Sequence, residues 1–290
     1  MFTASQPRRE VAMEGRLWER ILDLLPEPAA LGRRVYDDRI ILMIVLYATL
    51  HDRLISWACQ PDNWATPPKV GLPDPSTVSR RRREHAFEQA LNGVLEQSRG
   101  LLGPPARDAA IDSRPMVVGG ATKDPDAPAG RGVGGFARGY RAHMLIDTAG
   151  VVHALRVAPI NVNDRVAARE LLDDAPPGIE RIAGDANYDS IALLDRAASR
   201  GIKLYTPLRQ NRVGRRAQPR RRRLWRLMNR RIGASIANAR GGIERVFARM
   251  SNFACGLKPL PAWVRRLTRV TQWITAEVII YHAYLLTKTE

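Results

Sequence analysis

The 290-residue sequence predicts an α/β fold, in which a mixed five-stranded sheet is flanked by helices and preceded by a small all-α region. Two observations predict this organisation. Apolar residues recur at helical spacing between residues 15 and 60, whereas short β-rich runs alternate with helical segments from about residue 104 onward. With 45% hydrophobic residues, the chain can bury a sizeable core. We therefore expect a helical region over residues 1–105 and an α/β domain over residues 106–290.

The chain is strongly basic. Lys and Arg number 46 against 29 Asp and Glu, which gives a formal net charge of +17. Such an excess predicts a polyanionic partner, either nucleic acid or an anionic membrane surface. The most apolar run, at residues 40–50, is shorter than the roughly 20 residues that span a bilayer. The longer C-terminal run carries Glu277 and His282 and is typical of a core helix, so the membrane alternative is the weaker one.

Cysteine usage and the N-terminal segment indicate the compartment. Cys59 and Cys255 lie far apart with no paired spacing, so neither a disulfide framework nor a zinc site is expected. The N-terminal segment lacks the apolar stretch of a signal peptide. We therefore expect a protein of the reducing cytoplasm.

Three helices are expected in the N-terminal region. The first ends at Pro26, and the second begins after Tyr36 with acidic residues, which suit the helix dipole. A proline-rich break leads into a third helix capped by Ser76 or Thr77. Four arginines stand near its start, namely Arg80, Arg81, Arg82 and Arg83. A basic helix start suits a small DNA-binding unit, and the alternative is a solvated helix face.

The α/β domain begins with a strand, a loop and a hairpin. The strand is expected to end at Asp112. A glycine-rich segment over residues 119–139 predicts a mobile loop. Two β-rich runs within residues 141–159, joined by a turn at residues 147–150, predict the hairpin.

Helices and strands then alternate. A helix capped by Asn163 or Asp164 is followed by a strand that ends at Asp185. A second helix closes at Gly201 and leads into a strand over residues 202–207. The order of strand, hairpin, helix, strand, helix, strand and helix is that of a ribonuclease-H-like domain, with three antiparallel strands followed by two parallel ones.

An arginine-rich segment follows at residues 208–231, with eleven arginines and no acidic residue. Arginines neutralise phosphates and an indole can stack on a base, so the segment predicts binding to a DNA backbone. The predicted contacts are Arg220, Arg221, Arg222, Arg223 and Trp225. The alternative is a disordered basic linker.

Three acids in this layout predict a metal site. Asp112 and Asp185 end two strands that we expect to be neighbours, and Glu244 lies on the helix after the last strand. Carboxylate oxygens suit hard divalent ions, and two ions about 3.5–4 Å apart can stabilise both the attacking and the leaving oxygen of a phosphodiester displacement. Each acid alone has an ordinary explanation as a strand end, a turn residue or, for Glu244, a partner of Arg240 one turn earlier. Their joint placement favours the metal site.

Five segments of the sequence resemble the DDE transposases of bacterial insertion sequences. They are LPDPSTVSRRRRE at 72–84, IDSRPM at 111–116, GYRAHMLIDTAGVVHALRVAPINVNDR at 139–165, IAGDANYDS at 182–190 and RGGIERVFARMSNF at 240–253. The resemblance covers the chain from about residue 35 onward. It implies a catalytic triad of Asp112, Asp185 and Glu244 that binds two Mg²⁺ ions, for which Mn²⁺ can substitute.

The C-terminal signature of the family matches unevenly. Arg240 agrees with an arginine four residues before the glutamate, whereas Ala237 and Ser251 replace a tyrosine and a lysine that are common in the family. We expect Arg249 or Lys258 to take over one phosphate contact.

The hairpin also departs from the family in detail. Arg141 stands where relatives often carry lysine, and Asn187, further along, stands where many carry glycine. Asn tolerates left-handed backbone angles better than most residues, so the fold should survive. His143 and His153 are expected to be structural residues. The remaining predicted DNA contacts are Arg141, Arg240 and Arg249.

Together these features predict a DNA transposase that cuts at inverted terminal repeats and joins the freed 3′-OH ends to target DNA. Its partner is double-stranded DNA, and the joining of two ends to one target favours a dimer or a larger assembly. We expect no membrane association, and a location in the bacterial cytoplasm at the nucleoid. Two alternatives stay open, a catalytically degenerate relative that binds DNA without cutting it and a ribonuclease-H-like nuclease that hydrolyses without joining.

Overall fold

The structure, a computed structural model, describes most of the chain. The described residues are 8–28, 35–119, 122–132, 134–207, 219, 241–250, 257 and 260–288, with backbone alone for residues 8–13. The chain divides into two compact units. The first holds Met1–Gly103 and Thr275–Glu290, and the second holds Pro104–Ile274. The last residues, which the sequence assigns to the α/β domain, therefore join the first unit.

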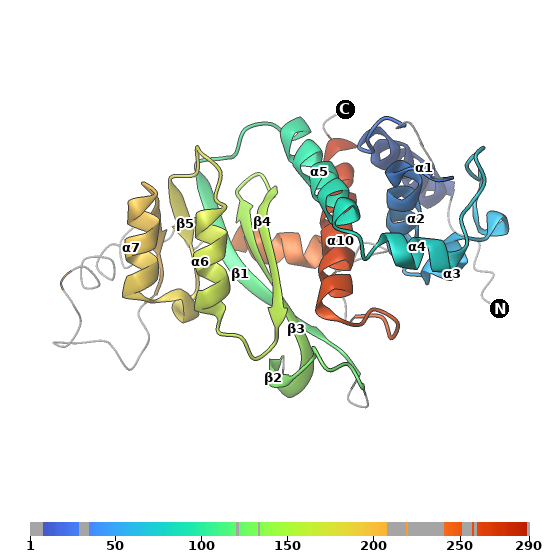
Figure 1. Cartoon of the computed structure of the whole chain (residues 1–290). Helices are drawn as coiled ribbons and strands as arrows, with labels where there is room; N and C mark the ends of the chain where they lie inside the picture. Colours follow the sequence, from blue (N-terminus) through green and yellow to red (C-terminus); the bar gives the residue numbers. More distant parts are fainter. Residues whose placement is uncertain are drawn as a thin grey trace. The chain divides into compact units, whose positions relative to one another are not determined.

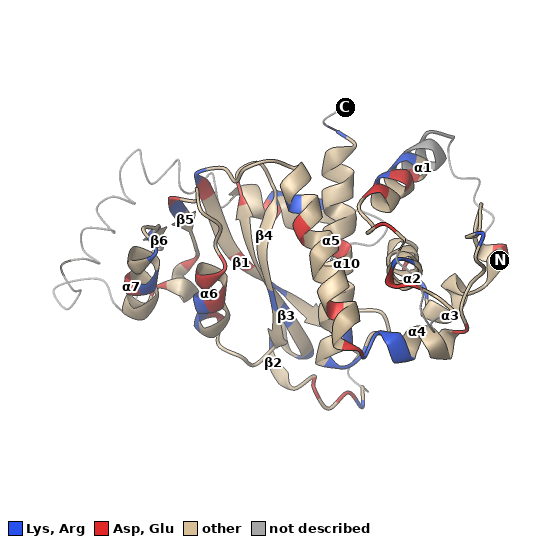
Figure 2. Ribbon diagram, turned by 45° about the horizontal axis from the view of Figure 1, so that its top comes forward, with Lys and Arg blue, Asp and Glu red and all other residues tan. Residues whose placement is uncertain are grey.

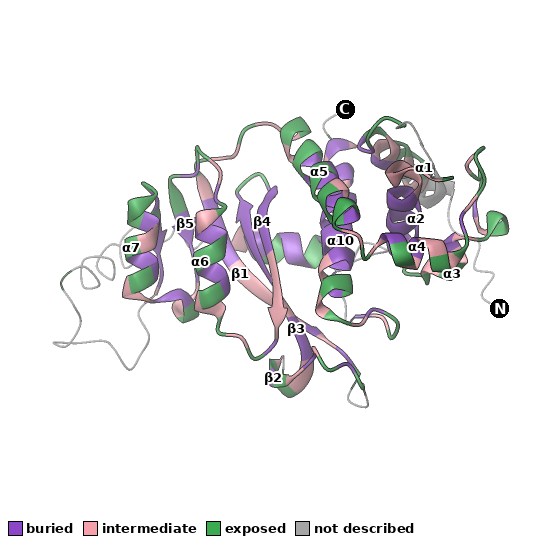
Figure 3. Ribbon diagram, viewed as in Figure 1, coloured by how far each residue is buried: buried purple, intermediate pink, exposed green. Residues whose placement is uncertain are grey.

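The first unit is built from helices (Figure 1). They are α1 (Arg8–Asp23), α2 (Asp38–Leu50), α3 (Ile55–Ala58), the 3₁₀ helix η1 (Pro61–Asn63), α4 (Pro75–Arg81), α5 (His85–Leu101) and the later part of α10 (Leu267–Leu286). Asp37 caps α2 by accepting a hydrogen bond from the backbone N–H of Ile40 at 3.0 Å. From Ile41 to Leu50 every residue of α2 is buried, and Figure 3 shows this helix in purple. The apolar run at residues 40–50 is thus a core helix.

The predicted third helix is in fact two helices, α4 and α5, separated by a short break. The predicted caps Ser76 and Thr77 are wrong, because Asp74 caps α4 by accepting a hydrogen bond from the Ser76 N–H at 2.7 Å. Pro75 then occupies the first helical turn, where a missing N–H leaves no hydrogen bond unmade. Asp followed by Pro is a stronger start signal than the serine and threonine after it.

The second unit is built around a six-stranded mixed sheet. Its strands are β1 (Asp108–Val117), β2 (Ala129–Gly132), β3 (Gly135–Asp147), β4 (Val152–Pro159), β5 (Arg181–Ala183) and β6 (Lys203–Tyr205). β1 pairs antiparallel with β3 and parallel with β5, while β3 also pairs with β4 and β5 with β6. Three antiparallel strands followed by two parallel ones confirm the predicted ribonuclease-H-like sheet.

β2 is the strand that the sequence does not predict. It pairs with the first residues of β3 inside the segment expected to be a mobile loop, so that expectation is wrong for residues 129–132. Its AGRG sequence has low β propensity, because Gly and Ala offer little side chain to pack on a sheet. A Cβ on Gly130 would lie 2.9 Å from atoms of Ile160, so the close approach requires glycine here.

The predicted turn, the cap of the helix after β4 and the end of the helix after β5 are confirmed. The turn at residues 147–150 joins β3 to β4. Asn163 caps α6 (Asp164–Asp173), because its side chain accepts a hydrogen bond from the Arg165 N–H at 3.0 Å. α7 (Ile191–Ser199) ends just before Gly201, whose φ of +73° suits glycine.

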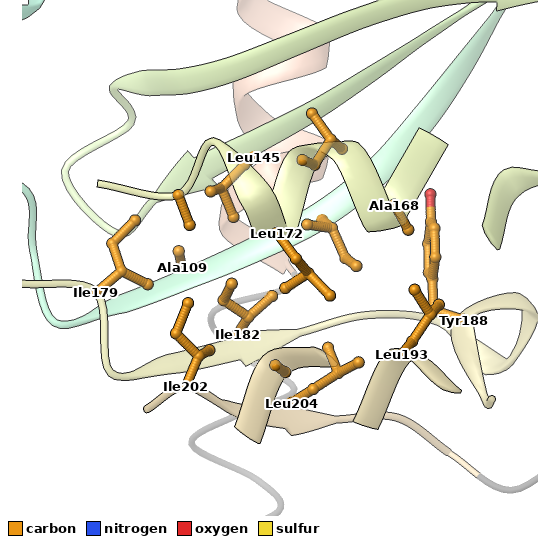
Figure 4. Packing of buried hydrophobic residues seen from close by; sticks show 14 of the residues in the cluster. Ala109, Leu145, Ala168, Leu172, Ile179, Ile182, Tyr188, Leu193, Ile202 and Leu204 are labelled. Atoms are coloured by element: carbon orange, nitrogen blue, oxygen red, sulfur yellow. The ribbon is translucent and has the colours of Figure 1, made fainter. Parts of the chain in front are cut away.

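One apolar cluster packs α6 and α7 against the sheet. Its members include Ala109 and Ile111 of β1, Ile182 of β5, Leu172 of α6 and Leu193 of α7. Figure 4 shows part of this cluster, with Tyr188 at one end beside Ala168 and Leu193. In Figure 1, α6 lies in front of the strands, and the helix over residues 241–250, drawn in orange, lies behind them. The sheet therefore carries helices on both faces, as predicted.

Candidate active site

The two aspartates of the predicted triad lie on neighbouring strands. Asp112 stands inside β1, so the prediction that it ends the strand is wrong. The strand continues because residues 113–117 remain paired with β3. β5 ends at Ala183, so the prediction that Asp185 ends this strand is wrong by two residues; Asp185 caps the short 3₁₀ helix η2 (Ala186–Tyr188).

The register of β1 and β5 sets both aspartates at one level. The last pair of this parallel ladder is Ala110 with Ala183. Asp112 and Asp185 each stand two residues beyond it, since 112 − 110 = 2 and 185 − 183 = 2. Neighbouring strands in a sheet are about 4.8 Å apart. We infer that the two carboxylates occupy adjacent places at this edge of the sheet.

Both aspartates also belong to the same face of the sheet. The strands stay adjacent beyond the ladder, because a Cβ on Gly184 would lie 3.2 Å from Cγ1 of Ile111. Ile111 and Ile182 point into the cluster under α6 and α7. Successive side chains of a strand alternate between faces, so Asp112 and Asp185 belong to the opposite face. The helix over residues 241–250 covers this face (Figure 1).

Glu244 lies on that helix, as predicted. One side of the helix is buried, through Ile243, Val246, Phe247 and Met250, while Glu244 is on the exposed side. Within the part of the chain that the structure describes, no three His, Cys, Asp or Glu residues are grouped so that they could hold a metal ion. The meeting of Glu244 with the two aspartates therefore stays a prediction.

Neutral donors hold the two aspartates. Asp112 Oδ1 accepts a hydrogen bond from the Ser113 N–H at 2.8 Å. Asp185 Oδ1 accepts from the Asn187 N–H at 2.8 Å, and its Oδ2 accepts from Asn187 Nδ2 at 3.0 Å. These bonds orient the carboxylates. The Asp-x-Asn turn was readable from the sequence, because Asp side chains often bond to the backbone two residues on.

Tyr188 shows that negative charge gathers at this edge. The residue is 1% exposed. Burial raises the pKa of Tyr188 well above its usual value, and the nearby charges of Asp112 and Asp164 raise it further. The sequence does not single out this residue. Carboxylate oxygens are a donor set that fits a hard divalent cation.

The four consecutive arginines divide between the interior and the surface. The side chain of Arg81 is only 6% exposed and pairs with Asp38 and Glu84. Arg80 and Arg83 are exposed, and Arg82 is half-buried. Arg81 is therefore a structural residue of the first unit rather than a DNA contact.

Arg141 is also used within the fold. Its Nη1 donates to the two carboxylate oxygens of Asp164 at 3.0 and 3.3 Å, and its Nη2 donates to the carbonyl of Arg131 at 2.6 Å. These bonds tie β3 to the start of α6, so the structure gives Arg141 a partner other than DNA. Arg249 is exposed, on the helix of Glu244. Other residues singled out in the sequence lie outside the described part of the chain: Arg220, Arg221, Arg222, Arg223, Trp225, Ala237, Arg240, Ser251 and Lys258.

The two hairpin histidines are buried, as expected of structural residues. His153 Nε2 lies 2.9 Å from Oδ2 of the buried Asp147. Neither ring nitrogen of His143 has a hydrogen-bond partner among the described residues. Burial, and then the charge of Arg141, lowers the pKa of His143 to about 4, so this imidazole is neutral at pH 7.

The fold has a counterpart among solved structures. It is similar to a piggyBac transposase in a cryo-EM structure of a synaptic complex with hairpin DNA, with a TM-score of 0.52 and 12% sequence identity. The alignment covers 95% of this chain and 71% of that one. No curated protein matches the chain. The described helices include none that is long and apolar enough to cross a membrane.

The sequence itself places the sheet and its two aspartates in a known family. The profile of the transposase DDE domain matches residues 103–281, which is well over half of the 290 residues. That span contains Asp112, Asp185 and Glu244, together with the whole six-stranded sheet. This chain therefore belongs to the transposase DDE domain family.

Proposed function

We propose that this chain is a DNA transposase that cuts at the inverted terminal repeats of a bacterial insertion sequence and joins the freed 3′-OH ends to target DNA. Asp112, Asp185 and Glu244 are its metal-binding residues. The observation that carries this proposal is the register of β1 and β5, whose last pair, Ala110 with Ala183, stands two residues before Asp112 and Asp185.

The donor set fits Mg²⁺ or Mn²⁺. Two bound ions would supply a nucleophile from water or the 3′-OH and would stabilise the leaving oxygen of the phosphodiester. Other residues of the chain hold the metal-binding aspartates in position. Ser113 and Asn187 donate hydrogen bonds to the two aspartates, and Tyr188 is buried in the apolar cluster under α6 and α7. A fixed carboxylate needs no reorganisation when its ligand arrives.

DNA is the partner that the charge favours. The net charge of +17 suits a polyanion, and the exposed Arg80, Arg83 and Arg249 are the described candidates for phosphate contacts. Because two ends are joined to one target, the active species is a dimer or larger assembly on DNA. Its place of action is the nucleoid of a bacterial cytoplasm.

The test is a cleavage and joining assay with duplex DNA that carries the repeats flanking the native locus. Wild type should give joined product in Mg²⁺, whereas Glu244→Gln, which keeps the size and removes the charge, should give none. Glu180→Gln is the matched control, because Glu180 is exposed on the same unit and pairs with Arg107. It should retain joining.

Other results would identify the alternatives. Cleavage without joined product would indicate a nuclease. If wild type binds the DNA but neither cuts nor joins it in Mg²⁺ or Mn²⁺, the chain is a DNA-binding relative and the proposal is wrong.

A further inference from the structure

A groove lies between α6 and α7 on the second unit. Its cavity volume is about 420 Å³. Three arginines, one acid, two serines and two apolar residues line it, namely Arg165, Arg169, Arg196, Asp195, Ser190, Ser199, Ala192 and Leu193. Figure 2 shows blue segments on both helices. We propose that this groove binds the phosphate backbone of duplex DNA and guides it to the edge that carries Asp112 and Asp185. The proposal rests on the proposed function.

The arginines of α6 have a spacing that suits a charged polymer. Arg165 and Arg169 are one helical turn apart on the same side of the helix, so their Cβ atoms are about 5–6 Å apart. Arg169 is exposed. Arg196 of α7 faces them across the groove and is also held by Asp173. Guanidinium groups match phosphate oxygens in geometry and keep their charge at any physiological pH.

The groove begins at the candidate active site. Arg165 Nε donates to the carbonyl of Asn187 at 3.1 Å, and Asn187 holds Asp185 through two hydrogen bonds. Ser190, at the start of α7, lies five residues after Asp185 in the chain and lines the same groove. Arg165 therefore links the groove to the turn that holds Asp185.

The experiment measures DNA binding without chemistry. A fluorescent duplex is titrated with the full chain in the absence of divalent metal over a series of salt concentrations. Arg169→Gln should weaken binding and make the slope of log K against log salt shallower by about one, because one phosphate contact is lost. Lys203→Gln removes the same charge from an exposed residue at the start of β6, outside the groove, and should leave the slope unchanged. Thermal unfolding of both variants shows whether they are folded.

A second measurement locates the DNA. A photo-crosslinking group attached through Ser199→Cys, inside the groove, should attach to the duplex, whereas the same group attached through Lys203→Cys should not. The groove proposal is overturned if Arg169→Gln binds like wild type, if both charge variants lose the same affinity, or if Ser199→Cys gives no crosslink.

The experiments distinguish a failure of the groove proposal from a failure of the proposed function. If wild type joins DNA but Arg169→Gln binds DNA normally, the groove proposal alone is wrong. If Arg169→Gln changes the salt slope but wild type never cuts or joins DNA, the proposed transposase activity alone is wrong.

Discussion

The acidic residues at the two ends of the β1–β5 strand pair have different hydrogen-bond and ion-pair partners. At the starting end, Asp108 pairs with Arg181, and Glu180 accepts hydrogen bonds from Arg107 at 2.7 and 2.8 Å. At the far end, Asp112 and Asp185 accept hydrogen bonds from a backbone N–H and from Asn187. Both ends carry acids; arginine pairs with those at the starting end, and hydrogen bonds from a backbone N–H and from Asn187 reach those at the far end.

This contrast separates two explanations for an acid at a strand end. An acid held by arginine already has its counter-charge and serves the fold. An acid held by neutral donors keeps its negative charge for a cation that arrives later. The position of an acid along a strand does not tell the two apart, whereas the charge of its partners does.

The largest expected effect comes from the far end. Asp185→Asn or Asp112→Asn should reduce cleavage and joining by at least roughly 100-fold, an effect of the size seen when one charge-stabilising group is removed from an active site. Asp108→Asn, at the starting end, should leave the activity within a few-fold of wild type. Single-turnover assays in Mg²⁺ measure all three. Equal losses at both ends would show that the partner of the acid carries no information about its role.

The contrast extends to the arginines of the first unit. Arg81→Ala should lower the free energy of unfolding by roughly 3 kcal/mol, because it leaves Asp38 and Glu84 without their buried partner. Arg80→Ala should change stability by less than about 0.5 kcal/mol and should weaken DNA binding instead. Urea unfolding and DNA titration of both variants test this. If the Arg81→Ala variant is as stable as wild type but binds DNA poorly, Arg81 is a DNA contact after all.

His143, on β3 opposite Ser113, gives a pH dependence. A pKa lowered from 6.5 to about 4 at His143 means that the unfolded chain binds more protons than the folded one between these pH values. Stability from this residue should therefore be fully present above pH 6.5 and fall as the pH drops toward 4, by up to about 3 kcal/mol. The free energy of unfolding of His143→Leu should depend less on pH between 4 and 6.5 than that of wild type. Urea unfolding at several pH values measures both. An unchanged pH dependence would mean that a residue other than His143 takes up the proton.

The smallest expected effect is on stability at the starting end. Asp108→Asn breaks an ion pair in which the side chain of Asp108 is 32% and that of Arg181 48% exposed, so we expect a loss of about 0–1 kcal/mol. The loss should shrink further at high salt, because ions screen exposed charges. Unfolding at low and high salt measures it. A larger loss would mean that the pair of Asp108 and Arg181 stabilises the fold more than an exposed ion pair usually does.

The sequence predicts most of the second unit because its signals are local. Alternating apolar residues predict β3 and β4, and an Asn cap predicts α6. β2 escapes because a short glycine-containing strand has little propensity of its own and depends on its pairing with β3. The break between α4 and α5 escapes because arginines favour a helix in isolation.

The candidate site divides in the same way. The strand positions of Asp112 and Asp185 follow from the order of elements, and their common level follows from a register that the sequence does not contain. Arg81 is misjudged because its partner, Asp38, lies 43 residues earlier in the chain. A basic run looks the same in sequence whether its side chains reach solvent or a distant carboxylate.

The common level of the two aspartates also limits how this gene can change. Adding or deleting one codon between Ala110 and Asp112 would turn Asp112 to the face under α6, since neighbouring residues of a strand point to opposite sides. A length change between β6 and the helix of Glu244 leaves the β1–β5 register intact. Among descendants of this chain, insertions should therefore accumulate in the arginine-rich interval and be absent from the first half of β1.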